Sequence, residues 1–128
     1  MYCNVLITKP FDQYFTYKFN IHQRISRGNL VFVPFGNKND QIGLVCEVFE
    51  SLPKKLEKFE IKEVSLVFEN ITLNEKTFNF LEWIAKYTLA PKGLVLKLII
   101  INNKIIEHNL IKSEKNIFSI NKVKLNKE

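Results

Sequence analysis

Apolar and polar residues alternate in the first part of the chain with the period expected of β-strands. Residues 2–8 are mostly apolar, and residues 15–19 read Phe-Thr-Tyr-Lys-Phe, so that aromatic and polar side chains alternate strictly. A period of two places the aromatic side chains on one face, which is typical of a half-buried strand. The pattern therefore predicts a first strand in residues 2–8 and a second in residues 15–19.

A third and a fourth strand are expected on either side of a turn. The third, residues 30–35, runs into Pro-Phe-Gly, and the polar sequence Asn-Lys-Asn-Asp follows before apolar residues resume at Ile42. Such residues between two apolar runs are typical of a hairpin. Both faces of residues 42–49 are partly apolar, which favours a small closed barrel, and Gly43 predicts a bulge or a tight bend.

The next segment is charged and then becomes apolar again. Residues 53–60 form a charged connection, and a fifth strand is predicted near residues 61–68. Five short strands with turn signals between them predict an antiparallel, barrel-like sheet.

The period changes to that of a helix after residue 72. Thr72 and Glu75 have the spacing of a capping box, and Pro91 should end the helix near Leu89, because proline cannot donate the next backbone hydrogen bond. Apolar side chains of this helix fall on one stripe, which we expect to be core. The stripe consists of Leu73, Phe80, Leu81, Ile84 and Tyr87, with Thr77 and Thr88 as its polar members.

The apolar residues 93–101 are compatible with either a helix or a strand. From residue 102 onward the chain is rich in Asn, Lys and Ile, with weak periodicity and no glycine or proline. We therefore expect an α+β domain in residues 1–101, made of a small antiparallel β-barrel-like sheet followed by one main helix. Residues 102–128 are expected to be a basic tail or the first piece of another domain.

The composition is that of one ordinary globular domain. The 128 residues are 46% hydrophobic and 25% charged, which argues against a disordered chain and against a membrane protein. The longest late apolar run, residues 94–101, is interrupted by Lys97 and is too short to span a bilayer. The first residues lack the features of a signal peptide. We expect a cytoplasmic protein with no membrane partner.

No group of residues points to catalysis or to a cofactor. Cys3 and Cys46 form no C-x-x-C pair, so we expect two small buried hydrophobic residues rather than a disulfide scaffold or a zinc site. His22 and His108 fall in segments that we expect to be polar loop or tail, without a nearby cysteine or serine motif. The sequence predicts neither an enzyme nor a bound metal.

The net charge favours an anionic partner. The chain holds 19 Lys and Arg against 13 Asp and Glu, a formal net charge of +6. Residues 1–70 hold nine basic and eight acidic side chains, and residues 71–128 hold ten and five, so the excess lies in the second half. Such a balance favours nucleic acid, and the alternative is a surface that is basic only for solubility.

Four short motifs carry a resemblance to a known family. They are Val-Pro-Phe-Gly at residues 33–36, Ile-Gly-Leu-Val at 42–45, Trp-Ile-Ala-Lys-Tyr at 83–87 and Ala-Pro-Lys-Gly at 90–93. In this order they resemble the N-terminal 3′-DNA-binding domain of the primosomal protein N-prime (PriA) family of replication-restart helicases. The resemblance implies a small antiparallel β-structure and a helix that capture the 3′ end of the nascent leading strand at a stalled fork. The implied partners are branched fork DNA and other primosome or replication-restart proteins.

The resemblance also implies a pocket for the 3′ end. The candidates for DNA contact are Phe15, Thr16, Tyr17, Gly36, Lys38 and Lys62. Among them, Phe15 is suited to stack on a terminal base, Gly36 lets the backbone approach a ligand, and Lys62 is suited to pair with a phosphate. Because Phe15 alternates with two other aromatic residues, a plain core role is the alternative for it.

Thr16 departs from the family pattern, which has aspartate at this position. A carboxylate accepts a hydrogen bond from a 3′-hydroxyl strongly and repels a 3′-phosphate, whereas a threonine hydroxyl is neutral. From the residue type alone we expect weak discrimination between the two kinds of 3′ end. Asp12 is a candidate substitute, although it matches a different position of the family.

The catalytic parts of the family are missing from the sequence. It contains no G-x-x-x-x-G-K-[ST] phosphate loop and no cysteine pairs for zinc. Residues 104–128 hold six lysines against three glutamates, so the last segment is either a basic tail or the truncated start of the family's winged-helix region. We expect a DNA-binding module, and the alternative is a stand-alone remnant of the helicase that acts as a protein-interaction module.

Overall fold

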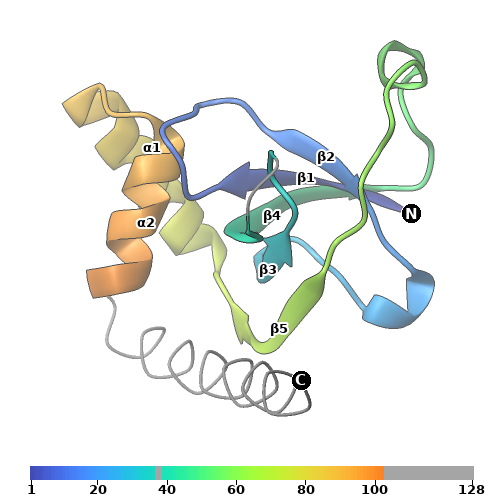
Figure 1. The fold of residues 1–128 in the computed structure, drawn as a ribbon. Coiled ribbons are helices and arrows are strands. Elements are labelled where there is room, and N and C mark those ends of the chain that lie inside the picture. The colour runs from blue at the N-terminus through green and yellow to red at the C-terminus, as the bar shows by residue number, and fades with distance from the viewer. Residues whose placement is uncertain (37–38, 103–128) are drawn as a thin grey trace, which may run out of the picture.

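A computed structural model describes residues 1–36 and 39–102 of the chain. Within these residues, five β-strands are followed by two α-helices (Figure 1). The strands are β1 (Tyr2–Ile7), β2 (Phe15–Lys18), β3 (Asn29–Val33), β4 (Gln41–Phe49) and β5 (Leu66–Thr72). The helices are α1 (Glu75–Thr88) and α2 (Lys92–Asn102), and short 3₁₀ helices occupy Ile21–Gln23 and Lys54–Leu56. The predicted α+β class is confirmed.

The five strands form one antiparallel sheet in the order β2-β1-β4-β3-β5. The predicted hairpin is present, since β3 pairs with β4 and Val33 lies opposite Gln41. The sheet is not closed into a barrel, so "barrel-like" describes it only loosely. A single parallel bridge, between Lys18 of β2 and Glu63, links one sheet edge to the segment before β5. β2 has four residues, so this edge is too short to form the row of backbone hydrogen bonds that would close the sheet into a barrel.

The fifth strand begins later than the sequence predicted, at Leu66 and not near residue 61. The Lys18 amide donates to the Lys62 carbonyl, and the Val64 amide donates to the Lys18 carbonyl, both at 3.0 Å. The segment before β5 is therefore bound to β2. Pairing with β3 starts only after the chain has left that edge.

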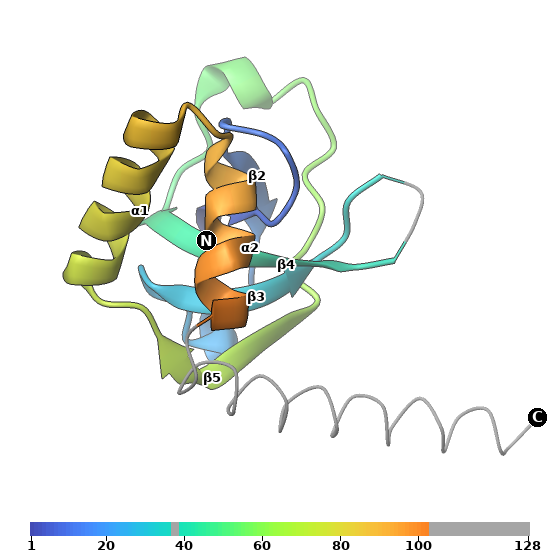
Figure 2. The same cartoon turned by 90° about the vertical axis from the view of Figure 1, so that its left-hand side faces the viewer.

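Apolar clusters cover both faces of the sheet. The cluster between the sheet and the helices contains Leu44, whereas the cluster on the other face contains its neighbour Val45. Successive residues of a strand point to opposite faces, so both faces of β4 are core, as the sequence predicted. Figure 2 shows α2 lying across the sheet with α1 beside it.

The bulge in β4 lies three residues after Gly43. Asn4 of β1 lies opposite Glu47 and the next residue, Val5, lies opposite Val45, so Cys46 is the extra residue. Gly43 has a different role, because a Cβ at this position would collide with the side chain of Val5. The glycine allows β1 and β4 to approach closely.

Helix α1 begins at a different cap from the one that the sequence predicted. Asn74 is the N-cap, and its side-chain oxygen accepts a hydrogen bond from the Thr77 amide at 3.0 Å. Thr72, the predicted cap, is the last residue of β5, because pairing with β3 extends the strand to that point. The helix ends as expected at Leu89, which adopts a left-handed conformation with φ of 56°.

The predicted core stripe of α1 is confirmed in part, because Leu73 and Leu81 are buried and Ile84 packs against the core. Phe78, Leu81 and Ala85 face the core, whereas Phe80 is 52% exposed and Tyr87 is 77% exposed. Phe78, Leu81 and Ala85 are three and four positions apart, and Phe80 and Tyr87 are seven positions apart. Residues at these spacings share a face of a helix, so each set lies on one face. The periodicity therefore predicted the helix and part of its buried face, but it did not show that Phe78 and Ala85, and not Phe80 and Tyr87, lie in the core with Leu81.

The apolar residues 93–101, for which the sequence allowed a helix or a strand, form a second and shorter helix beside the main helix α1. Helix α2 buries Val95, Leu96 and Ile100 against the sheet and α1. Its start is pressed onto β1, because a Cβ on Gly93 would collide with the carbonyl oxygens of Ile7 and Lys9. No helix in residues 1–36 and 39–102 is long and apolar enough to cross a membrane. Residues 103–128, the predicted tail, lie outside the described residues.

Candidate functional site

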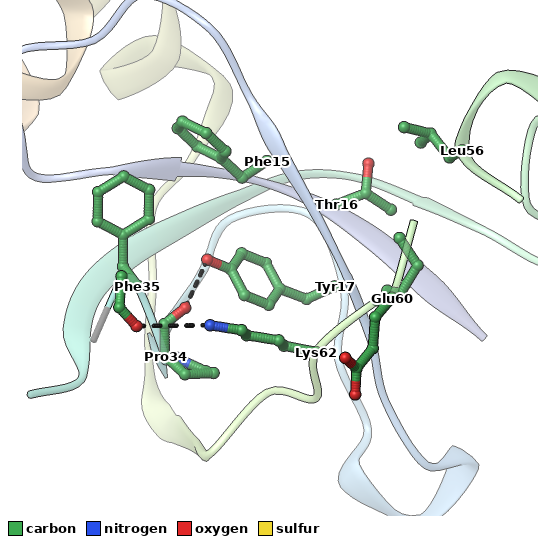
Figure 3. A pocket seen from close by; sticks show the side chains of 10 residues that line it. Phe15, Thr16, Tyr17, Pro34, Phe35, Leu56, Glu60 and Lys62 are labelled. Atoms are coloured by element: carbon green, nitrogen blue, oxygen red, sulfur yellow. Dashed lines mark hydrogen bonds between the residues drawn. The ribbon is translucent and has the colours of Figure 1, made fainter. Parts of the chain in front are cut away.

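A surface pocket beside the edge strand β2 brings most of the predicted site residues together. It has a volume of about 260 Å³, and its walls come from β2, the turn after β3 and the segment before β5 (Figure 3). Its lining residues are Phe15, Thr16, Tyr17, Pro34, Phe35, Gly36, Leu56, Glu60, Ile61 and Lys62. Lys38, the remaining candidate, lies outside the described residues. The other five candidates thus surround one hollow, although they come from three separate segments.

Phe15 belongs both to the pocket and to an aromatic cluster. Its ring meets Phe35 edge to face with centroids 5.0 Å apart, and Phe11 contacts both rings at 5.8 and 5.7 Å. Phe15 is half-buried, so the expected site role and the expected core role are compatible. The cluster holds the Phe15 ring in place at the pocket wall, which lowers the entropy cost of stacking a ligand against it.

Tyr17 connects two walls of the pocket. Its side chain is 4% exposed, and its hydroxyl donates a hydrogen bond to the Pro34 carbonyl at 2.8 Å. Burial raises the pKa of the Tyr17 phenol to about 12, so the group stays a donor at neutral pH. This bond ties β2 to the turn that carries Phe35 and Gly36.

Gly36 forms the open rim of the pocket. Its φ of 68° lies in the left-handed region, which a glycine adopts without the strain that a Cβ adds. No atom lies within 4 Å of the position that a Cβ would take. The glycine is therefore favoured by the shape of the turn and not by tight packing, and the space above it is free for a ligand.

Lys62 and Glu60 bring opposite charges to the same wall. The Lys62 ammonium donates to the Gly36 carbonyl over 3.4 Å, a long bond, and it has no ion pair among the described residues. A lysine held this loosely is free to contact a phosphate. The Glu60 carboxylate repels a phosphate that comes near it, so the pocket has one basic side only.

The Thr16 side chain lies on the face of β2 opposite to Phe15 and Tyr17. Its hydroxyl donates to the Asn4 side-chain oxygen at 2.7 Å, and the Asn4 side-chain nitrogen donates to Glu47 at 3.1 Å. Thr16 nevertheless lines the pocket, as does its neighbour Phe15.

The backbone of Thr16 also faces the pocket side of β2. The backbone groups of Lys18 bond to the segment 62–64, and those of alternate residues point to the same edge of a strand. The amide and carbonyl of Thr16 therefore point toward that edge, and they have no partner within residues 1–36 and 39–102. An edge with free backbone groups is a natural place for a ligand to form hydrogen bonds.

Asp12 does not take the place of the missing aspartate. Its carboxylate accepts a hydrogen bond from the Lys92 amide at 3.0 Å, at the first residue of α2, and it does not line the pocket. A carboxylate is favoured at this position because the amides at a helix N-terminus carry partial positive charge. Its role is to bind the loop before β2 to the helix.

Apart from Lys62, the third wall of the pocket was not predicted. Leu56, Glu60 and Ile61 fall in or beside the segment that the sequence presented as a charged connection. The two aliphatic residues among charges were the only local signal of packing. Nothing in the local pattern showed that this segment would return to β2.

A second hollow lies between the two helices. It has a volume of about 310 Å³ and is lined by Phe80, Ile84, Val95, Leu98 and Ile99. Beside it, Trp83 and Tyr87 stack on each other with centroids 5.4 Å apart and are 61% and 77% exposed. We call this area, the groove together with Trp83 and Tyr87, the outer helix surface. Such exposed apolar patches mark binding surfaces in soluble domains.

Neither cysteine belongs to a site. Cys3 is buried and Cys46 partly buried, and burial raises the pKa of their thiols to about 12 and about 11. The expectation that they serve as small hydrophobic residues is confirmed for Cys3 and holds in part for Cys46. No cluster of three or more His, Cys, Asp and Glu suited to a metal ion occurs in the described part of the chain.

The positive charge is spread unevenly. Residues 1–36 and 39–102 hold twelve Lys and Arg against ten Asp and Glu, so most of the net charge of +6 belongs to the residues outside this part. The pocket region therefore has to attract an anion with individual side chains, such as Lys62, and not with a strongly basic face.

Comparison with known protein families gives one match. The family model of the PriA 3′DNA-binding domain (3′BD) matches residues 4–101. No curated protein matches the chain. The matched range contains β1 from Asn4 onward, β2 to β5 in full, both helices up to residue 101 and the whole pocket beside β2.

Proposed function

We propose, from the premise that the chain belongs to the PriA 3′-DNA-binding domain family, that it binds the 3′ end of nascent leading-strand DNA at stalled replication forks. It would act there in replication restart and primosome assembly, in the bacterial cytoplasm, beside other replication-restart proteins. The observation that carries the proposal is the pocket beside β2. Five residues chosen from the sequence for 3′-end contact line this one hollow.

The chemistry of the pocket supports a nucleotide ligand. The half-buried ring of Phe15 offers a face or an edge to a terminal base, and stacking of this kind contributes about 1–3 kcal/mol per base. Lys62 offers a cation without an ion pair in the described residues, and the turn at Gly36 leaves room for backbone contact. An apolar wall beside a cation and free backbone groups matches a base attached to a sugar and a phosphate.

Binding to a model fork tests the proposal. We expect micromolar or weaker affinity in fluorescence anisotropy, because a site of this size reaches few phosphates. Two or three phosphate contacts predict that raising the salt from 50 to 200 mM weakens binding by about 10- to 40-fold. A fork without a 3′ end at the branch is the matched control and should bind less tightly. An affinity that stays the same when salt is added and when the 3′ end is removed would contradict the proposal.

We further propose that the chain has no catalytic activity of its own. The match is to a binding domain, and the sequence contains no phosphate loop for ATP. The purified chain should release no phosphate from ATP and should not unwind a duplex, with or without DNA. DNA-stimulated release of phosphate from ATP that co-purifies with the chain would disprove this.

A second function, as a protein-interaction module, is supported by the outer helix surface. Its exposed aromatic and aliphatic side chains suit an apolar protein partner better than a phosphate backbone. Salt separates the two functions, because an apolar interface responds little to salt whereas DNA binding weakens steeply. A chain that binds no fork DNA but binds a replication-restart protein at high salt would favour the second function.

A further inference from the structure

Helix α1 carries a second apolar stripe besides the one in the core. The second stripe consists of Phe80, Trp83, Ile84 and Tyr87, which are three or four positions apart and so share one face of the helix. The rings of Phe80, Trp83 and Tyr87 are all more than half exposed. A helix that is apolar on two sides is typical of one that is covered on both.

Helix α2 shows the same feature more strongly. Between residues 93 and 101 its only polar side chain is Lys97. Part of the helix lies in the core with Leu96, yet Leu94 and Ile101 are exposed. An apolar residue on every side is expected of a helix that is buried all round.

The exposed sides of the two helices meet in the groove of the outer helix surface. Figure 2 shows α1 and α2 side by side, and the groove between them has a volume of about 310 Å³. All five of its lining residues are apolar. Within residues 1–36 and 39–102 the groove stays open, so it offers a place for apolar side chains from elsewhere.

The chain itself continues right beside this groove. Leu98 lines the groove, and α2 ends one turn later at Asn102, about 6 Å further along the helix. The sequence then runs on for 26 residues, which lie outside the described structure. Even in a conformation as compact as a helix, 26 residues reach about 39 Å, whereas the 14 residues of α1 span about 21 Å. The segment is therefore long enough to run back along the whole groove.

The composition of residues 103–128 also fits an apolar groove. Nine of the 26 residues have large apolar side chains, and a segment of this length is too short to build a core of its own. Its six lysines do not prevent contact, because a lysine lays its aliphatic stem on an apolar surface and keeps the ammonium group in water. The nine are Ile105, Ile106, Leu110, Ile111, Ile117, Phe118, Ile120, Val123 and Leu125.

We propose that residues 103–128 fold back over the outer helix surface and place apolar side chains in the groove between α1 and α2, so that a protein partner has to displace them. The tether favours this occupant over a second copy of the chain or a free partner, because a short linker gives an effective concentration in the millimolar range. The inference goes beyond the proposed DNA binding and does not depend on it. For the alternative function as an interaction module, it makes the segment an autoinhibitory cover.

The fluorescence of Trp83 tests the proposal without a label, because the chain contains one tryptophan. Quenching by acrylamide is compared in the natural full chain and in a full-length variant with Ile106→Asn, Leu110→Asn, Ile117→Asn and Phe118→Asn. A segment that is docked about nine-tenths of the time leaves Trp83 open about one-tenth of the time. The quenching constant should therefore rise about threefold or more in the variant.

A control within the segment separates apolar contact from charge. The full-length variant with Lys112→Asn, Lys115→Asn, Lys122→Asn and Lys124→Asn carries the same number of changes but keeps every apolar side chain. Its quenching constant should equal that of the natural chain. Far-UV circular dichroism and a thermal melt check that both variants keep the fold of the domain.

A second pair of variants changes the groove and not the segment. Leu98→Gln puts a polar group into the groove wall on α2, away from the helix that carries Trp83, and should release the segment and raise the quenching constant. Phe59→Gln is the matched change of an exposed apolar residue in the loop after the 3₁₀ helix Lys54–Leu56 and should change nothing. If the fourfold asparagine variant fails to fold, Leu98→Gln decides the matter.

Three results would overturn the inference. One is a quenching constant that is the same in the natural chain, the asparagine variant and Leu98→Gln. Another is protection of Trp83 that grows with protein concentration, which would make a second copy of the chain the occupant. The third is equal release by the lysine variant, which would assign the effect to charge. Failure to bind fork DNA would refute the proposed function and leave this inference standing.

Discussion

The pocket beside β2 and the outer helix surface both expose aromatic side chains, but their surroundings differ. In the pocket, Phe15 is held by Phe35 and Phe11, and Lys62 and the free backbone groups of Thr16 lie around it. On the outer helix surface, Trp83 and Tyr87 stack only on each other beside a groove lined by apolar side chains. The first combines an apolar wall with a cation and free backbone groups, whereas the groove of the second is lined by apolar side chains.

Exposure of aromatic residues therefore does not by itself identify a nucleic-acid site. A nucleotide presents a flat base together with a charged and hydrogen-bonding backbone, so a site for it needs both kinds of contact. Of these two hollows, the pocket supplies both kinds of contact and the groove between the helices does not. We therefore propose that the pocket, and not the outer helix surface, contacts DNA, and three pairs of variants test this difference.

The largest effect should come from the buried face of α1, the helix whose exposed face belongs to the outer helix surface. Leu81 is 2% exposed in the core, so Leu81→Ala should lower the free energy of unfolding by about 2–5 kcal/mol. Phe80→Ala is the matched change one residue earlier, and it should cost less than about 1 kcal/mol because the ring is half in water. Chemical denaturation of both variants measures the difference. Equal losses would show that Phe80 supports the fold and that its surface is not free for a partner.

The next effect should separate the two surfaces by DNA affinity. Phe15→Ala should weaken fork binding by about 1–3 kcal/mol, or roughly 5- to 150-fold, through loss of stacking. Trp83→Ala removes a more exposed aromatic ring and should leave fork affinity within twofold. Anisotropy titrations with one labelled fork give both values, and a thermal melt confirms that Phe15→Ala is folded. A larger loss in Trp83→Ala would place the DNA on the helices and refute our assignment.

The smallest effect should come from single lysines. Lys62→Ala should weaken fork binding by about two- to fivefold, because an exposed charge contact contributes up to about 1 kcal/mol. It should also lower the slope of log affinity against log salt by about one, the signature of one lost phosphate contact. Lys86→Ala on α1 makes the same change of net charge at an exposed position away from the pocket. If the two variants lose the same slope, Lys62 acts through general charge only.

Much of the fold could be predicted from local patterns. Strict alternation in residues 15–19 indicated β2, and the Pro-Phe-Gly turn with its polar sequence indicated the hairpin of β3 and β4. Periodicity and Pro91 indicated α1 and its end. These features depend on residues that are neighbours in the chain, whose conformational preferences are set by sterics and side-chain spacing.

The candidate site was predicted less completely. Phe15, Thr16, Tyr17, Gly36 and Lys62 were named from the resemblance, and they meet in one pocket. Asp12 resembled a substitute for the missing carboxylate, but the fold places it at the start of α2. The rest of the wall that carries Lys62 was missed, because the return of residues 60–64 to β2 depends on backbone pairing that leaves no local pattern.

The order and kind of most helices and strands, and the residue types available for chemistry, could therefore be predicted from local sequence. Tertiary packing decided that Phe78 and Ala85 join Leu81 in the core, where the pocket closes and which side chain the Thr16 hydroxyl bonds. Thr16, Asn4 and Glu47 are far apart in the chain and meet through strand register and one bulge. Register is settled by the burial of both sheet faces together, and a hydrogen-bonding role belongs to the partners that register supplies.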